Sequence, residues 1–399
     1  MFYRISMLAV VAVVAGLSAR AEAQDEDANR FEFTVDARAR VEEVDEDNAL
    51  QDASALTLRL RAGLKTPSRR GLSALAELEA VENVGAEDYN SGSNGRTEYS
   101  AILDPEDVEL NQLVVRYLDG SHYLQVGRQR MVLDNARFFG DVGYRQNQQT
   151  YDAVSYMNTA LQGQQFLYAY MSRARRFLSD EHPVGEIDMN SHLLNYRLQR
   201  LNSDTFTAYA YLIDMDTPAV VQNSTKTFGL RYSGTYATTA ADLLYTLEYA
   251  NQSDYADGAS TNDADYVAVE LGVKFKNEWL MQFGQERLGG DGVYGFQTPF
   301  GTNHAFNGFA DIFAARTPAT GLVDSYARLV VPLFGARILL TAHDFGADQG
   351  GADHGSELNL QVEKRFAERF GINLMIADYR ADNFAVDTTK WALWLDFRY

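Results

Sequence analysis

Four arginines are the residues of this sequence whose type and spacing most clearly suggest chemistry. Arg128, Arg130, Arg137 and Arg145 lie within residues 126–153, among Gln and Asn side chains. A guanidinium group binds a carboxylate through paired hydrogen bonds, so a cluster of arginines is suited to binding an anionic solute. The pattern of this stretch predicts a strand, a long polar loop and a second strand.

Such a loop has two interpretations. Gly127, Gly140 and Gly143 let the backbone bend sharply, which would allow the segment 131–150 to fold inward and narrow a pore. The alternative is an ordinary arginine-rich loop on the surface. The rest of the chain favours the pore, because it predicts many amphipathic strands that would close into a membrane barrel around the loop.

Alternating apolar and charged residues predict these strands. The alternation runs from Phe31 to Val41, from Leu56 to Lys65 and from Leu72 to Glu79. In each segment, arginines or carboxylates share one face, which a globular core could hold only with costly pairing. The water-filled interior of a barrel holds them easily.

About 18 strands are expected, at residues 31–41, 56–65, 72–81, 112–118, 123–130, 151–158, 164–172, 191–200, 205–213, 225–236, 240–251, 264–276, 279–288, 321–332, 335–344, 357–366, 370–380 and 389–399. The final strand places Leu393, Leu395, Phe397 and Tyr399 on one face, and a terminal aromatic residue resembles the assembly signal of outer-membrane barrels.

Connection lengths alternate between short and long. Short turns such as 202–204 alternate with long connections at 83–108, 131–150, 173–190 and 289–320. Outer-membrane barrels have short periplasmic turns and long extracellular loops, so we predict an all-β transmembrane antiparallel barrel in the bacterial outer membrane. A soluble array of β-sandwiches is the alternative.

The N-terminal region predicts export. Residues 1–23 have the charged, apolar and small-residue parts of a secretory signal peptide, with a retained anchor as the alternative. Residues 24–30 form a short acidic segment, and 31–399 a single barrel domain.

The alternation of apolar and polar residues breaks down in the strand expected at 123–130, beside the arginines. Leu124 and Val126 share their parity with Arg128 and Arg130. Either a bulge near Gly127 reverses the facing, or these arginines lie above the apolar band.

Composition argues against several other functions. The formal charge of −20 opposes nucleic-acid binding, and the absence of cysteine excludes disulfides and thiol nucleophiles. The six histidines show no metal-ligand spacing and no catalytic motif is present, so we expect neither an enzyme nor a cofactor. Acidic loop residues, at 45–47 and around 254–265, are candidates for calcium, but solvated acidic loops are the favoured interpretation because no EF-hand order of ligands is present.

Alternation also predicts which charged residues line the interior. The basic ones are Arg38, Arg40, Arg59, Arg61, Arg116, Arg197, Arg231, Arg328 and Arg398, and the acidic ones are Glu32, Asp36, Glu77, Glu79, Glu248, Glu270, Glu286, Asp324, Glu357, Glu363 and Asp396. A ladder of arginines would pass an anionic sugar through weak, repeated binding. Alternatively, these charges pair across the lumen and brace the barrel.

Several motifs resemble the alginate export family of outer-membrane proteins. They are the segments at 56–61 (LTLRLR), 87–90 (EDYN), 127–130 (GRQR) with 133–138 (LDNARF), 143–147 (GYRQN) and 149–153 (QTYDA). The resemblance implies an 18-stranded passive channel whose arginine-lined constriction selects an anionic polysaccharide or oligosaccharide. The candidate pore-lining residues are then Arg128, Arg130, Arg137 and Arg145, with Arg59, Arg61 and Asn135 in support.

The expected partners are an anionic saccharide or small anionic solute, outer-membrane lipid and possible periplasmic export proteins. Rival interpretations are a general or substrate-specific uptake porin for small solutes, a barrel enzyme with a nucleophile near the rim, and a receptor acting through its acidic loops.

Overall fold

A computed structural model of the protein describes residues 30–200 and 203–399. The predicted signal peptide and all but the last residue of the acidic segment lie outside these residues. The strands are β1 Glu32–Glu46, β2 Ala53–Lys65, β3 Leu72–Asn83, β4 Asp107–Asp119, β5 His122–Gln129, β6 Thr150–Asn158, β7 Gln164–Arg175, β8 Glu186–Gln199, β9 Thr205–Ile213, β10 Thr225–Ala237, β11 Ala241–Asp254, β12 Asp263–Phe275, β13 Leu280–Leu288, β14 Leu322–Leu333, β15 Ala336–Gly346, β16 Asp353–Phe366, β17 Phe370–Arg380 and β18 Thr388–Arg398.

Helix is confined to two short turns in the described part of the chain, η1 Val221–Asn223 and η2 Asn303–Ala305. Over the same residues, no helix has the length and apolar character needed to cross a membrane.

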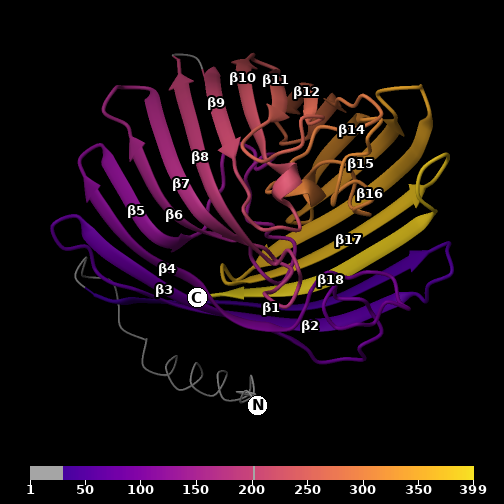
Figure 1. The fold of residues 1–399 in the computed structure, drawn as a ribbon, viewed down its shortest axis with the longest axis horizontal. Coiled ribbons are helices and arrows are strands. Elements are labelled where there is room, and N and C mark those ends of the chain that lie inside the picture. Colours follow the sequence, from indigo (N-terminus) through magenta and orange to yellow (C-terminus); the bar gives the residue numbers. More distant parts are fainter. Residues whose placement is uncertain (1–29, 201–202) are drawn as a thin grey trace.

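The strands form one closed sheet. Each strand pairs antiparallel with its neighbours in sequence, and β1 also pairs with β18, from Asp36 opposite Arg398 to Glu46 opposite Thr388. Figure 1 shows the strands following one another around a ring, with coiled segments in the space that they enclose. Closure leaves no unpaired sheet edge, as a membrane barrel requires. The predicted all-β barrel of about 18 strands is therefore confirmed.

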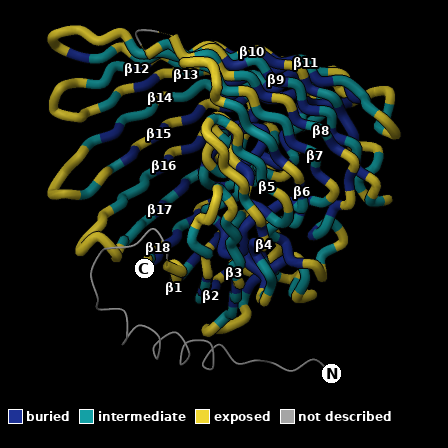
Figure 2. Tube along the Cα trace, turned by 90° about the vertical axis from the view of Figure 1, so that its left-hand side faces the viewer, coloured by how far each residue is buried: buried dark blue, intermediate teal, exposed yellow. Residues whose placement is uncertain are grey.

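The two faces of the wall differ as the alternation predicts. On β2, the side chains of Ala55, Thr57, Arg59 and Arg61 are buried. Leu56, which lies between Ala55 and Thr57, is 37% exposed. Leu393, Leu395 and Tyr399 at the C-terminus are also exposed on the outside. Figure 2 shows buried and less buried residues alternating along the strands, with the exposed segments gathered mainly at the turns and loops. Polar side chains therefore face the lumen and apolar ones face outward.

The expected asymmetry of the connections is present, with one correction. The β4–β5 connection is only residues 120–121, whereas 84–106 join β3 to β4 and 289–321 join β13 to β14. The predicted loop at 173–190 is wrong, because β7 and β8 extend into it and leave only 176–185 as the connection. Arg173 and Arg175 form ion pairs with Glu186 and Asp188 across these two strands. Because all four side chains are charged, the sequence pattern of this paired hairpin is that of a polar loop.

Candidate functional site

Two long connections fold into the barrel and form the candidate site. We call residues 130–149, between β5 and β6, the arginine loop, and residues 289–321, between β13 and β14, the second inner loop. Figure 1 shows coils of both regions, purple and orange, inside the ring of strands.

The arginine loop reaches opposite parts of the wall. Gln146 donates to Thr57 Oγ1 on β2 at 2.8 Å, and the backbone N–H of Gln148 donates to Glu79 on β3 at 2.9 Å. Towards the other side, Asp134 accepts a hydrogen bond from Asn195 on β8 at 2.8 Å. These contacts confirm that the loop enters the lumen.

The second inner loop is fixed to a different part of the wall. The backbone N–H of Ala310 donates to Glu357 on β16 at 3.0 Å, and Asn307 donates to Asp324 on β14 at 3.1 Å. A further hydrogen bond joins Gln252 on β11 to the Gln297 carbonyl at 3.0 Å.

The two loops also bind each other. A short parallel bridge joins Phe139 to Phe300, whose rings stack with centroids 5.8 Å apart. Tyr144 stacks on His304 with centroids 3.7 Å apart and an interplanar angle of 11°. The loops therefore form a single internal layer across part of the lumen.

A buried ionic cluster holds this layer to β1 and β18. Arg145 lies 3.4 Å from Glu42 on β1 and 3.0 Å from Asp311 of the second inner loop, and Lys390 on β18 contacts the same two carboxylates at 3.3 and 2.5 Å. Burial would raise the pKa of Asp311, but His304, Lys390 and Arg145 outweigh it and hold this pKa well below its usual range. Burial lowers the pKa of the neighbouring His304.

A second buried ion pair holds the centre of the layer. Arg137 binds Glu286 on β13 through two hydrogen bonds of 2.8 and 2.9 Å, and it also donates to Asn303 and Asn307 at 3.1 and 2.8 Å. Burial alone would lower the pKa of Arg137, and the paired Glu286 more than offsets this effect. The arginine therefore stays charged, and four of its five N–H donors are bound by protein groups.

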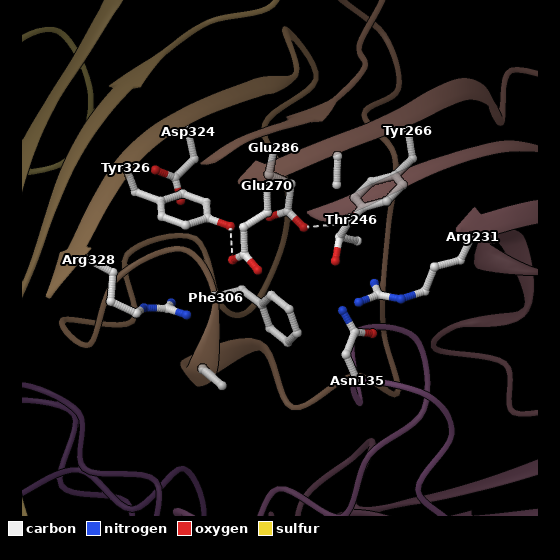
Figure 3. A pocket seen from close by; sticks show the side chains of 12 residues that line it. Asn135, Arg231, Thr246, Tyr266, Glu270, Glu286, Phe306, Asp324, Tyr326 and Arg328 are labelled. Carbon is white, nitrogen blue, oxygen red and sulfur yellow. Dashed lines mark hydrogen bonds between the residues drawn. The ribbon is translucent and has the colours of Figure 1, made fainter. Parts of the chain in front are cut away.

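Beside this layer lies a cavity of about 290 Å³, which we call the lumen cavity. Its lining includes Asn135 from the arginine loop, Phe306 from the second inner loop, and side chains from the wall strands β10 to β14. Figure 3 shows the guanidinium groups of Arg231 and Arg328 pointing in from opposite sides, with Phe306 between them and Glu270 above.

A second cavity, of about 250 Å³, lies beside the short β16–β17 turn and we call it the basic pocket. Its basic lining residues are Arg38, Lys364, Arg365, Arg369 and Arg398, and its acidic ones are Glu363, Glu368 and Asp396. Cations therefore outnumber anions around this pocket.

The structure brings together some of the predicted site residues. Arg137 and Arg145 lie in the internal layer, and Asn135 lines the lumen cavity. Arg59 and Arg61 face inward on β2, but each is buried in an ion pair, with Asp36 and Glu79 respectively. These four arginines brace the structure, which favours the bracing interpretation for them.

Arg128 and Arg130 lie elsewhere. Arg128 shares the outward face of β5 with Val126 and binds Asp152 at 2.9 Å. The pairing of β5 with β4 and β6 continues in register through Gly127, so Arg128 lies above the apolar band rather than beyond a bulge. Arg130 follows the end of the strand, is 53% exposed along its side chain and pairs with Asp141 at 2.7 Å.

Sequence reasoning missed the second inner loop as part of the site. Its aromatic content was the available signal: Tyr294, Phe296, Phe300, Phe306, Phe309 and Phe313 are too many for a solvated loop. It also missed Tyr266 and Tyr326, because alternation assigns a face but does not say which inward side chains surround a cavity. Within 30–200 and 203–399, no group of three or more His, Cys, Asp or Glu side chains is placed to hold a metal ion.

Comparison with known proteins gives a family and a fold. The family model described as alginate export matches residues 28–287. No match is found among curated proteins. Among solved structures, OccAB4 of Acinetobacter baumannii is similar with a TM-score of 0.74 at 12% identity, over 93% of this chain and 98% of that one.

Two structures from Pseudomonas aeruginosa agree with this fold. OccK9 (OpdG) has a TM-score of 0.74 at 12% identity, over 94% of this chain and 99% of that one. The outer membrane protein opdK has a TM-score of 0.70 at 12% identity, over 93% and 98% respectively. At these identities the likeness establishes the fold, and the barrel is that of an outer-membrane protein.

Proposed function

Because this chain belongs to the alginate export family and forms an outer-membrane barrel, we propose that it is a passive channel that admits small polar solutes selectively. Selective passage needs weak binding by groups that line a narrow path. Direction is then set by the solute gradient, and the proposal includes no catalytic step.

The observation that carries this proposal is the internal layer. The arginine loop and the second inner loop join through Phe139 and Phe300, and ion pairs at Arg137 and Arg145 fix them to the wall. The lumen cavity beside the layer has a volume of about 290 Å³, close to the lower end of the roughly 300–1,000 Å³ found for small-molecule sites. This space suits a small solute better than a polymer chain.

A second candidate function is passage of an anionic polysaccharide or oligosaccharide. The basic pocket favours it, since cations exceed anions there and a carboxylate-bearing sugar would be attracted. For a polymer to pass, the internal layer would have to move away from the wall.

Planar-bilayer recording with the purified protein separates these functions. We expect stable conductance, uptake of small polar solutes into proteoliposomes, and little current block by alginate oligomers. Block by the oligomers together with exclusion of small solutes would support the polysaccharide channel instead. Absence of conductance would overturn both.

A further inference from the structure

We propose that the lumen cavity selects small zwitterions, which carry both an ammonium and a carboxylate group. This inference rests on the proposed channel function and adds a substrate class to it. It follows from two side chains of the cavity, Glu270 on β12 and Arg328 on β14, whose charges no ion pair within the described residues neutralises.

The other charged side chains around the cavity are occupied by protein groups. Arg231 pairs with Glu248 at 2.6 Å. Glu286 is held by Arg137. Asp324 is 1% exposed and lies 2.9 Å from His343 Nδ1. None of these groups offers a free charge to a solute.

Glu270 is held only by neutral donors. Tyr326 O–H donates to it at 2.9 Å and Gln282 donates to it at 3.0 Å. A carboxylate offers about four lone-pair positions, so two remain for an ammonium group. The side chain is only partly buried and opens to the cavity (Figure 3).

Arg328 is left without a carboxylate partner. Its guanidinium carbon lies 5.4 Å from the centre of the Tyr326 ring, and its buried Nε has no hydrogen-bond partner among the described residues. A guanidinium group in this state can bind a solute carboxylate through paired hydrogen bonds.

The strand register explains why these two charges stay apart although both touch Tyr326. Glu270, Gly284 and Tyr326 lie in one row across β12, β13 and β14. A Cβ at Gly284 would lie 2.3 Å from Tyr326 Cζ, so the glycine leaves room for the ring to cover it and reach Glu270.

In the next row, Gln282 is opposite Arg328 and donates to Glu270 itself. The wall thus presents one negative and one positive charge on either side of a tyrosine, facing the same cavity. A zwitterion is the small solute whose charges match both.

The test is initial uptake into proteoliposomes held at zero membrane potential. The probes are radiolabelled serine, which is a zwitterion, N-acetylserine, which is an anion, and serine amide, which is a cation. For the unchanged protein we expect serine to enter about five-fold faster than either analogue, a modest ratio because the site is wet.

Two variants should shift this preference in opposite directions. Arg328→Gln should slow serine to the rate of serine amide or below, and Glu270→Gln should slow it towards the rate of N-acetylserine. A folding defect would lower all three rates together. Lys226→Gln is a matched control, because Lys226 shares the outward face of β10 with the exposed Phe228.

The outcomes separate the two proposals. Conductance with equal uptake of the three serine compounds overturns the zwitterion site and leaves the channel. A preference that survives in both variants also overturns the site. If the unchanged protein shows neither conductance nor uptake, the channel function itself is wrong.

Discussion

Arg145 of the arginine loop and Asp311 of the second inner loop form an ion pair inside the barrel, with 3.0 Å between Nη2 and Oδ2. Each partner also contacts the opposite charge on the wall, Arg145 at Glu42 and Asp311 at Lys390. The lumen is therefore narrowed by two loops that share one ionic cluster.

Removing the carboxylate of this pair should loosen the internal layer. Asp311→Asn leaves Arg145 and Lys390 with only Glu42 between them, and breaking a buried pair costs about 3 kcal/mol. We expect larger or strongly fluctuating single-channel currents. Asp242→Asn, which removes an exposed partner of Lys276, is the control. Unaltered current noise in Asp311→Asn would mean that the pair does not hold the layer.

Arg137 should not tolerate replacement by lysine. A lysine keeps the charge, but it cannot reproduce two bonds to Glu286 and further bonds to Asn303 and Asn307. We expect Arg137→Lys to weaken docking of the second inner loop by about 2 kcal/mol. The rate of amide hydrogen exchange within 289–321 would rise by the factor that corresponds to this loss of docking free energy. An unchanged exchange rate would show that Arg137 does not hold the second inner loop.

Arg128 should have little influence on ion selectivity. Its side chain lies on the outward face with Val126 and is paired with Asp152. Arg128→Gln should therefore leave the reversal potential across a salt gradient unchanged. A shift towards cation preference would show that this guanidinium group acts on the lumen, as the sequence motif suggested.

Acidification should loosen the layer through His304. Burial places the pKa of His304 below its usual value of about 6.5, so the docked loop favours the neutral ring. The stabilisation is complete above about pH 6.5 and is lost as the pH falls through the lower pKa of the docked state. Asp311 stays ionised in this window, because its pKa is held well below its usual range.

Current recordings at pH 7.5 and 5.5 check this effect, since open-channel noise should increase at the lower pH. His304→Gln, which retains a donor for Asp311, should remove the dependence. Equal pH dependence in the variant would assign the effect to another group.

Gly127→Ala should destabilise the barrel. Gly127 has φ of 120°, and a Cβ there would lie 2.2 Å from the Leu113 carbonyl oxygen of the neighbouring strand. Backbone strain of about 1–3 kcal/mol and this collision would act together. Gly346→Ala is the control, because Gly346 has no left-handed φ and a Cβ there would lie 3.7 Å from its nearest neighbour, the Ala352 carbonyl oxygen. Thermal unfolding followed on heated gels would compare them, and equal midpoints would refute the argument.

The sequence by itself determined the wall of this protein. Alternation is a local property, since successive side chains point to opposite faces wherever the strand lies. The inward Arg59 and outward Leu56 follow from this rule, and so does the strand count. Alternation did not decide between an arginine loop inside the lumen and one on the surface. Charged residues near strand ends led to a wrong prediction of a loop at 173–190, where Arg173 and Glu186 pair across two strands.

Only the tertiary structure decided which charges are free. Glu286 lies far along the chain from Arg137, yet the two meet because the loop crosses the lumen. Arg328 has no ion-pair partner among the described residues, because the strand register places it in the row next to that of Glu270, with the Tyr326 ring beside it. Such pairings depend on how the closed barrel and its inner loops bring distant segments together. The alternation of side chains along a strand carries no information about these distant contacts.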